Sequence, residues 1–292
     1  MRFSSLGEEQ DNSMRQKWGY LSNHPAFLKT PFGTLLRLST WKGHCLFHVP
    51  TIVSLPAWGI RMYLPPEWRG VAKLIYSFRE MYEPELLYLG QLLSACDTFV
   101  DVGASYGLYT LVGASIVGQT GRVISFEPAS RSSETLKRNI ELNGLRNVTL
   151  VRAALSDHEG RAKLYLHDDS SRNSLGALAE LPHGCEEVQV LTLDDLMVEP
   201  NLGRLKAIKM DVEGAEEMVL RGGEELLAQF RPAVIFEINP GAAMRLDLSP
   251  TGAWDILARL GYLFYRIENG EPRRICGTPS DGNVLACVGG LP

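Results

Sequence analysis

The stretch 97–128 constrains the fold of this chain more than any other part of the sequence. Residues Thr98–Val102 are apolar and β-branched, as in a buried parallel strand, and residues 106–117 have the pattern of a helix with few charges. Residues 122–126 form a second apolar run, which is followed by Glu127. The order strand, turn, helix, strand predicts a nucleotide-binding βαβ unit, in which the terminal carboxylate is placed to bind a ribose hydroxyl pair.

The turn after the first strand indicates which nucleotide this unit holds. Its glycines, Gly103 and Gly107, are spaced G-x-x-x-G, which differs from the G-x-G-x-x-G fingerprint of dinucleotide-binding proteins. Asp101 would repel a pyrophosphate but would attract the ammonium and sulfonium groups of S-adenosylmethionine. The turn therefore favours S-adenosylmethionine as the cofactor, and a NAD-dependent oxidoreductase is the alternative from another class.

The same turn matches the G-x-S-x-G pattern of the nucleophile elbow in α/β-hydrolases. That fold requires an acid and then a histidine downstream of the serine. The last histidine is His183, and the later strand-like segments contain none. The lack of a histidine in the later strand-like segments therefore argues against a hydrolase.

Composition narrows the possible partners. The net charge of −5 predicts no basic face for nucleic acid. The five cysteines are far apart and form no CxxC pair, so we expect reduced thiols and a cytoplasmic location. No run reaches the roughly 18–20 apolar residues that a membrane span needs, and the first residues do not resemble a signal peptide. We therefore expect neither a nucleic-acid nor a membrane partner.

The length of 292 residues suits one large α/β domain with an added region. We predict a disordered N-terminus over residues 1–15, a lid or helical region over residues 16–96, and the cofactor-binding domain over residues 97–292. We expect residues 16–80 and an irregular insertion at 158–193 to select the substrate.

The N-terminal region contains two candidate functional features. Residues 46–49 and 60–64 suggest short strands, so His44 and His48 are not expected to share a helix face, and we predict no metal site there. Residues 71–93 predict two helices that are broken at Glu83, where Pro84 suits the first turn of the second helix. Glu83, or Tyr82 before it, is our candidate for a residue that closes over the cofactor.

Small and apolar residues follow the third predicted strand, residues 148–151. Ala154 and Leu155 lie where parallel strands end, so they are candidates to flank the adenine ring. Asp157 either binds the adenine amino group or opens a turn, and the sequence does not separate these alternatives.

Carboxylates gather after the fourth and fifth predicted strands. Asp211, Glu213 and Glu216 follow the strand 205–210, and Glu237 lies at the end of the strand 233–238. Bringing such carboxylates together is costly unless a cation or a proton is shared between them. We hypothesise that Asp211 faces the cofactor and that Glu213 acts as base or Mg²⁺ ligand for a substrate hydroxyl, with Glu237 as a further catalytic candidate.

Together these segments resemble the FkbM-type methyltransferases of the class I S-adenosylmethionine-dependent enzymes. The resemblance covers roughly residues 80–240. The segments that carry it are YEPE (82–85), DTFVDVGASYGLYT (97–110), FEP (126–128), ALSDHEG (154–160), VLTLDDL (190–196), KMDVEGAE (209–216) and FEIN (236–239).

The resemblance implies a Rossmann-like α/β fold with a seven-stranded, mostly parallel sheet whose last strand runs antiparallel. It also implies a set of cofactor-binding residues around the first two strands. This set comprises Asp101, Gly103, Ala104, Ser105, Tyr106, Gly107, Glu127 and Pro128. Ser105 stands where the family usually has an asparagine, which leaves one hydrogen bond in doubt.

The resemblance further implies O-methylation, commonly of a hydroxyl on a sugar or a secondary metabolite. Methyl transfer from a sulfonium is an in-line displacement, so alignment supplies much of the rate, whereas an aliphatic hydroxyl also benefits from a base or a metal. N- or C-methylation of a small molecule and a non-catalytic cofactor-binding module are the alternatives.

Overall fold

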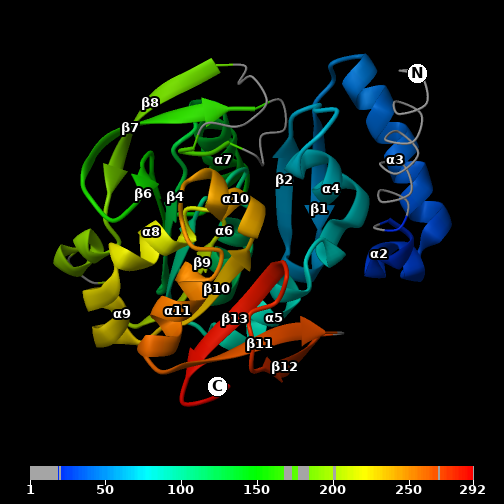
Figure 1. Cartoon of the computed structure of the whole chain (residues 1–292). Helices are drawn as coiled ribbons and strands as arrows, with labels where there is room; N and C mark the ends of the chain where they lie inside the picture. The colour runs from blue at the N-terminus through cyan, green and yellow to red at the C-terminus, as the bar shows by residue number, and fades with distance from the viewer. Residues whose placement is uncertain are drawn as a thin grey trace, which may run out of the picture.

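The computed structural model describes residues 19, 21–167, 173–176, 184–199, 202–268 and 270–291. Its centre is an eight-stranded sheet in the order β12-β11-β13-β10-β9-β3-β4-β5 (Figure 1). The strands are β3 (Thr98–Val102), β4 (Arg122–Phe126), β5 (Val148–Val151), β9 (Leu205–Met210), β10 (Ala233–Ile238), β11 (Tyr262–Glu268), β12 (Glu271–Ile275) and β13 (Gly282–Val288). The pairs from β5 to β10 are parallel, and β13 runs antiparallel between β10 and β11.

The sheet confirms the Rossmann-like prediction and adds one strand to it. The seven expected strands are present, and the last of them, β13, is antiparallel as predicted. The additional strand β12 pairs antiparallel with β11 at the edge of the sheet. Its Pro272 made this stretch look irregular in the sequence, but an edge strand tolerates a proline because one side of it needs no ladder hydrogen bond.

Helices cover both faces of the sheet. Alternate strand residues point to opposite faces, so Phe99 belongs to one buried cluster and Val100 to the other. The helices of the domain are α6 (Leu108–Val117), α7 (Ser130–Leu142), α8 (Glu216–Arg221), α9 (Glu224–Phe230), α10 (Pro240–Arg245) and α11 (Gly252–Arg259). Helix α6 packs with Phe99, whereas α8, α9 and α11 pack with Val100.

The N-terminal region is built from helices around a small antiparallel strand pair. Its elements are α2 (Pro25–Lys29), α3 (Pro31–Leu46), β1 (Thr51–Leu55), β2 (Ile60–Leu64), α4 (Val71–Phe78) and α5 (Pro84–Leu92). Strand β2 and the helix break before Pro84 agree with prediction. The strand expected at 46–49 was wrong, because α3 continues to Leu46, where burial of Trp41 and Cys45 favours the helix. His44 lies on α3, whereas His48 follows it with a φ of 53°.

This region packs closely on the rest of the chain. Met62 and Leu64 share a buried cluster with Leu111 of α6, and the Asn139 side chain bonds both the backbone N–H and the carbonyl of Tyr63. The boundary at residues 96 and 97 therefore stays a prediction about domain organisation. The predicted disorder of residues 1–15 lies outside the described residues.

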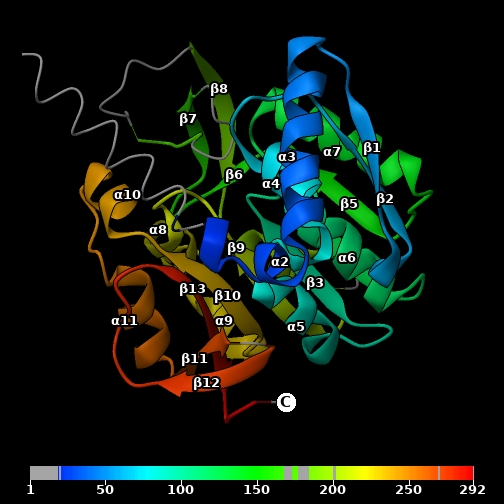
Figure 2. The ribbon, with the colours of Figure 1, turned by 90° about the vertical axis from the view of Figure 1, so that its right-hand side faces the viewer.

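The insertion forms a three-stranded sheet beyond the carboxyl end of the main sheet (Figure 2). Its strands are β6 (Ala154–Leu155), β7 (Gly160–Leu166) and β8 (Gly184–Leu191). A bridge between Tyr165 and Ser174 adds residues 173–176 to this sheet. Within the described ranges, no helix combines the length and apolar character needed to cross a bilayer. All five cysteines are described and are free thiols.

Candidate active site

A cleft lies where β3, β4 and β9 end, which is the usual ligand position in an open α/β sheet. It encloses about 700 Å³ including its open mouth. The predicted residues that line it are Gly103, Ser105, Glu127, Pro128, Ala154, Leu155, Asp211 and Glu213. The sequence-distant motifs therefore meet in one cleft.

Any side chain at Gly103 would force the neighbouring backbone of the cleft to move. Its φ is +74°, and an added Cβ would lie 1.9 Å from the carbonyl oxygen of Asp211. The N–H groups of Gly103 and Ala104 both donate to the carbonyl of Phe126, at 3.0 and 2.9 Å. The turn after β3 is thus pressed against the ends of β4 and β9, and Gly103 allows this close approach because it has no Cβ.

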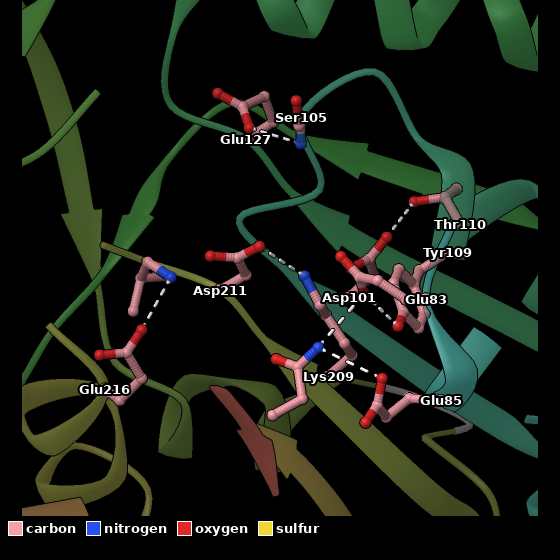
Figure 3. A network of polar contacts seen from close by, with 12 residues as sticks. Glu83, Glu85, Asp101, Ser105, Tyr109, Thr110, Glu127, Lys209, Asp211 and Glu216 are labelled. Carbon is pink, nitrogen blue, oxygen red and sulfur yellow. Dashed lines mark hydrogen bonds and ion pairs between the residues drawn. The ribbon is translucent and has the colours of Figure 1, made fainter. Parts of the chain in front are cut away.

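Glu127 lines the cleft with a carboxylate that is fixed by backbone donors. One oxygen accepts from the N–H of Ser105 at 2.7 Å (Figure 3). The other accepts from the N–H of Ala129 at 2.9 Å. Burial raises the pKa of Glu127 to about 7, although both hydrogen bonds act in the opposite direction. Each oxygen retains a second lone pair, so the carboxylate can still accept hydrogen bonds from a ribose.

Two buried polar atoms beside this turn have no hydrogen-bond partner among the described residues. They are Asp101 Oδ1 and Ser105 Oγ. The other Asp101 oxygen accepts from Thr110 Oγ1 at 2.6 Å (Figure 3). Burial raises the pKa of Asp101, while Lys209 and Thr110 lower it. A buried acceptor without a hydrogen-bond partner costs free energy. A ligand that places donor groups at the end of β3 would remove this cost.

Lys209 is the charged residue that sequence reasoning missed. It lies on β9 and is 5% exposed, and its Nζ is 3.1 Å from Asp211 Oδ2 and 4.8 Å from the centre of the Tyr109 ring. Burial alone would lower the pKa of Lys209, but Asp211, Glu83 and Asp101 outweigh burial and raise it. The ammonium therefore stays charged and holds Asp211 at the floor of the cleft.

Glu83 lies behind Lys209 and is not one of the residues that line the cleft. Its carboxylate accepts from the Tyr109 hydroxyl at 2.6 Å and from Asn283 Nδ2 at 3.4 Å (Figure 3). Asn283 also contacts Glu85 at 3.3 Å. Burial raises the pKa of both glutamates, to about 7 for Glu85. This arrangement makes Glu83 a support beneath the cleft rather than a cover over it.

The remaining carboxylates divide into two groups. Asp211 and Glu213 line the cleft, whereas Glu216 and Glu237 lie beside it, in a small pocket under α10. Asp211, Glu216 and Glu237 can place one oxygen each within 4.8 Å of one another. Glu216 also accepts from the N–H of Val212 at 3.1 Å.

Shared protons are one way in which these carboxyl groups can lie so close together. Burial, with help from Asp211, raises the pKa of Glu216 to about 7, and burial with Asp211 and Glu216 raises that of Glu237. Both side chains can therefore hold a proton near neutral pH.

Several predicted cofactor residues do not line the cleft. The Tyr106 hydroxyl donates to Glu67 Oε1 at 2.5 Å, away from the cleft, and an added Cβ at Gly107 would meet Leu136. The Asp157 carboxylate contacts His158 at 2.7 Å, which favours the turn over adenine recognition. Asp101, in β3, and Ala104, in the turn that carries Gly103, are also absent from the lining.

Other lining residues were not predicted. They come from α4, from the ends of β3 and β4, from the residue before β6, from the insertion and from the turn after β9. They are Val71, Val102, Phe126, Ala153, Leu164, Asn173, Ser174, Leu175, Val212 and Ala215. Ser174 ties the insertion to the acidic turn, because its hydroxyl donates to the carbonyl of Glu213 at 3.4 Å. No sequence motif marks Val71 or Ser174, since only the tertiary fold brings them to the cleft.

Comparison with protein families identifies a domain that spans this whole site. The model of the methyltransferase FkbM domain matches residues 101–264. The matched range contains β3, β4, β9 and β10 together with the insertion, and so includes most of the cleft lining.

Two curated fungal proteins match part of the chain. Methyltransferase 1 of Beauveria bassiana is 33% identical over 146 residues, which cover 43% of this chain and 58% of that protein. Methyltransferase sdnD of Sordaria araneosa is 30% identical over 156 residues, which cover 43% of this chain and 60% of that protein. The match thus spans less than two thirds of either relative.

Two solved structures resemble parts of the chain. Methyltransferase FkbM from Methylobacillus flagellatus has a TM-score of 0.43 and 17% identity, over 74% of this chain and 53% of that chain. A SAM-dependent O-methyltransferase from Thermotoga maritima has a TM-score of 0.38 and 13% identity, over 82% of this chain and 77% of that chain.

Proposed function

The chain belongs to the FkbM methyltransferase family. We propose that it is an S-adenosylmethionine-dependent enzyme that methylates a hydroxyl on a small molecule or glycan. The observation that carries this proposal is the pairing of two kinds of residue in one cleft. Gly103 and Glu127 offer the features of a nucleoside site, and Asp211 and Glu213 offer carboxylates beside it.

We propose that the cofactor lies along the ends of β3 and β4. Glu127 would accept the ribose hydroxyls, and Ala154 and Leu155 would flank the adenine. Gly103, which lines the cleft, and the unpaired Ser105 hydroxyl would meet the methionine part. S-adenosylmethionine supplies a methyl group that is already activated, so the residues need only hold it in line with the acceptor.

The acceptor hydroxyl needs a base, and Glu213 is the best candidate among the described carboxylates. It lines the cleft, whereas Glu237 lies in the neighbouring pocket. Asp211 also lines the cleft, but its carboxylate is held by Lys209. We therefore assign proton removal to Glu213, the orientation of the reacting groups to Asp211, and a supporting role to Glu237.

The test is turnover by Glu213→Gln on acceptors drawn from hydroxylated sugars and metabolites. We expect kcat to fall by about 100-fold or more with unchanged affinity for S-adenosylhomocysteine, because only the base is lost. Glu159→Gln, in an exposed turn, is the matched control and should keep full activity. Full turnover by Glu213→Gln would contradict the role of this residue, and product methylated on nitrogen or carbon would contradict O-methylation.

Mg²⁺ is a secondary proposal that rests on the oxygen atoms of Asp211, Glu216 and Glu237. The same carboxylates are accounted for by shared protons and by the Val212 hydrogen bond. Addition of Mg²⁺ to a titration with S-adenosylhomocysteine separates the two explanations. If the affinity for S-adenosylhomocysteine changes with Mg²⁺, the result supports a bound ion. If it does not change, shared protons are the remaining explanation.

We further propose that residues 16–96 act as the lid that selects the acceptor. Val71 of this region lines the cleft, and Glu67 accepts a hydrogen bond from Tyr106 in the turn after β3. The cytoplasmic location expected from the cysteines stays a prediction.

A further inference from the structure

Exposed large apolar side chains are concentrated on two adjoining helices of the N-terminal region. Phe32 is 86% exposed, and Leu36 is 66% exposed one turn further along α3. We call the whole set the α2–α3 stripe. It comprises Leu28, Phe32, Leu35, Leu36, Leu46 and Phe47. Helix α3 lies at the outside of the molecule in both views, beyond the β1–β2 pair (Figures 1 and 2).

The apolar side chains at the exposed positions of helix α3 stand beside polar ones such as Ser39 and Lys42. The inner side of the helix buries Trp41 and Cys45 against the core, so the exposed apolar side chains are not needed to hold the helix in place. An exposed apolar patch of this kind marks an interaction surface.

The stretch of chain that carries the stripe has charges of one sign. Residues 21–66 contain four Lys or Arg and no Asp or Glu, in a chain whose net charge is −5. Lys29 and Lys42 are exposed beside the stripe, and Glu67, the first acid after it, is buried and bonded to Tyr106. A partner for this surface must therefore combine apolar groups with negative charge.

An aromatic side chain and two lysines border the stripe. Trp68 is 57% exposed and lines a surface groove together with Leu35, Lys42 and Lys73. Trp residues prefer the boundary between the apolar and polar layers of a bilayer, and Lys side chains extend from there to phosphate groups. The groove thus has the chemistry of a bilayer interface.

We propose that the α2–α3 stripe docks on the surface of an anionic lipid bilayer. The Phe and Leu side chains enter the boundary between headgroups and acyl chains, and Lys29, Lys42 and Lys73 contact lipid phosphates. We expected no membrane partner because no apolar run is long enough to span a bilayer. Binding to the surface of a bilayer does not need such a run.

Charge favours a bilayer over a second copy of the chain. In a symmetric dimer through this face, the same patch would meet itself, and the lysines of one copy would face those of the other. Anionic lipid instead neutralises them. Docking does not depend on the proposed O-methylation, so either can fail without the other.

The experiment is vesicle flotation of the full chain. We expect it to float with phosphatidylcholine vesicles that contain phosphatidylserine, to remain free of pure phosphatidylcholine vesicles, and to be released by salt. The double variant Phe32→Ser, Leu36→Ser should lower the partition coefficient by about tenfold or more. Val198→Ser is the matched control, because Val198 is 85% exposed on a distant turn.

Charge is tested separately from apolar contact. Lys29→Glu with Lys42→Glu should lower binding by about tenfold or more, because each lysine near an anionic surface contributes about 1 kcal/mol. Lys163→Glu, on an exposed position of β7, should have no effect. Retained affinity for S-adenosylhomocysteine in each variant shows that it is folded.

Three outcomes would overturn the proposal. The wild-type chain could fail to float with phosphatidylserine vesicles at low salt, or the Phe32→Ser, Leu36→Ser variant could float as well as the wild type. The third is a wild-type dimer in light scattering that this double variant converts to a monomer without any vesicle binding, which would assign the stripe to a second copy.

Discussion

The cleft is built from two sets of residues that differ in origin. The floor consists of Gly103, Ser105, Glu127 and Asp211, which stand at the ends of adjacent parallel strands. The rim consists of Val71, Leu164 and residues 173–175, which come from the N-terminal region and the insertion. Each floor residue is held by the sheet register, whereas the rim depends on how separate segments pack.

This difference suggests a division of labour. Sheet register allows the floor little variation, so it suits a cofactor that is always the same. The rim can change without disturbing the sheet, so it suits the choice of acceptor. If this is correct, changes in the floor should abolish cofactor binding, and changes in the rim should affect mainly the acceptor.

Removal of the buried ammonium beneath the floor should have the largest effect. Lys209→Met leaves the buried carboxylates Asp101 and Glu83 without their cation, so we expect the free energy of unfolding to fall by about 3–5 kcal/mol. Denaturant unfolding measures this change. Lys206→Met on the same strand, where the side chain is half-buried, is the control and should change stability little. Equal losses in the two variants would contradict the special position of Lys209.

A methyl group at Gly103 should have the next largest effect. In Gly103→Ala the new Cβ meets the Asp211 carbonyl, so the floor must shift, and we expect affinity for S-adenosylhomocysteine to fall by about 100-fold. Gly59→Ala is a matched control, because Gly59 also has a positive φ, of 66°, but nothing lies within 4 Å of its added Cβ. Calorimetric titration should show unchanged affinity for this control, and a similar loss in both would refute the steric argument.

These floor residues show what the sequence could and could not predict. Strands β2, β9 and β10 have the predicted bounds because their apolar runs are short and clearly delimited. Lys209 was overlooked because it interrupts such a run without a motif. A central parallel strand is buried on both faces, however, so a lysine within it must be paired, and that rule could have identified it.

The rim could not be predicted from the sequence for a different reason. Ser174 reaches the cleft through a bridge to Tyr165 and a hydrogen bond to Glu213, and neither leaves a periodic pattern. Both contacts of Ser174 join segments that are distant in the sequence or irregular, so they arise only from the folded structure.

Two properties that depend on Glu127 should change with pH in opposite directions below about pH 7. They are the stability of the fold and the affinity for S-adenosylhomocysteine. Burial raises the pKa of Glu127 from its usual range to about 7, so its contribution to stability is full at low pH and is lost as the pH rises through 7. Ribose binding needs the ionised carboxylate, so affinity for S-adenosylhomocysteine should fall by about tenfold per pH unit below 7. Thermal unfolding and titration across this range measure the two slopes, and slopes of the same sign would contradict the assignment.

A truncation in the rim should have the smallest effect on the cofactor. Leu175→Ala removes part of a half-buried side chain, so we expect less than about a threefold change in affinity for S-adenosylhomocysteine and a larger change in the KM for the acceptor. Steady-state kinetics with both substrates separates these effects. If Leu175→Ala loses cofactor binding and keeps its KM for the acceptor, the rim binds the cofactor and the proposed division between floor and rim is wrong.

The central claim is that the floor binds S-adenosylmethionine through Glu127. The most direct test is a calorimetric titration of the wild type and of Glu127→Gln with S-adenosylhomocysteine and with NAD. We predict binding of S-adenosylhomocysteine alone, and about a 10- to 100-fold loss of affinity in Glu127→Gln, because hydrogen bonds to an ionised group are lost. Binding of NAD, or unchanged affinity in Glu127→Gln, would contradict the account.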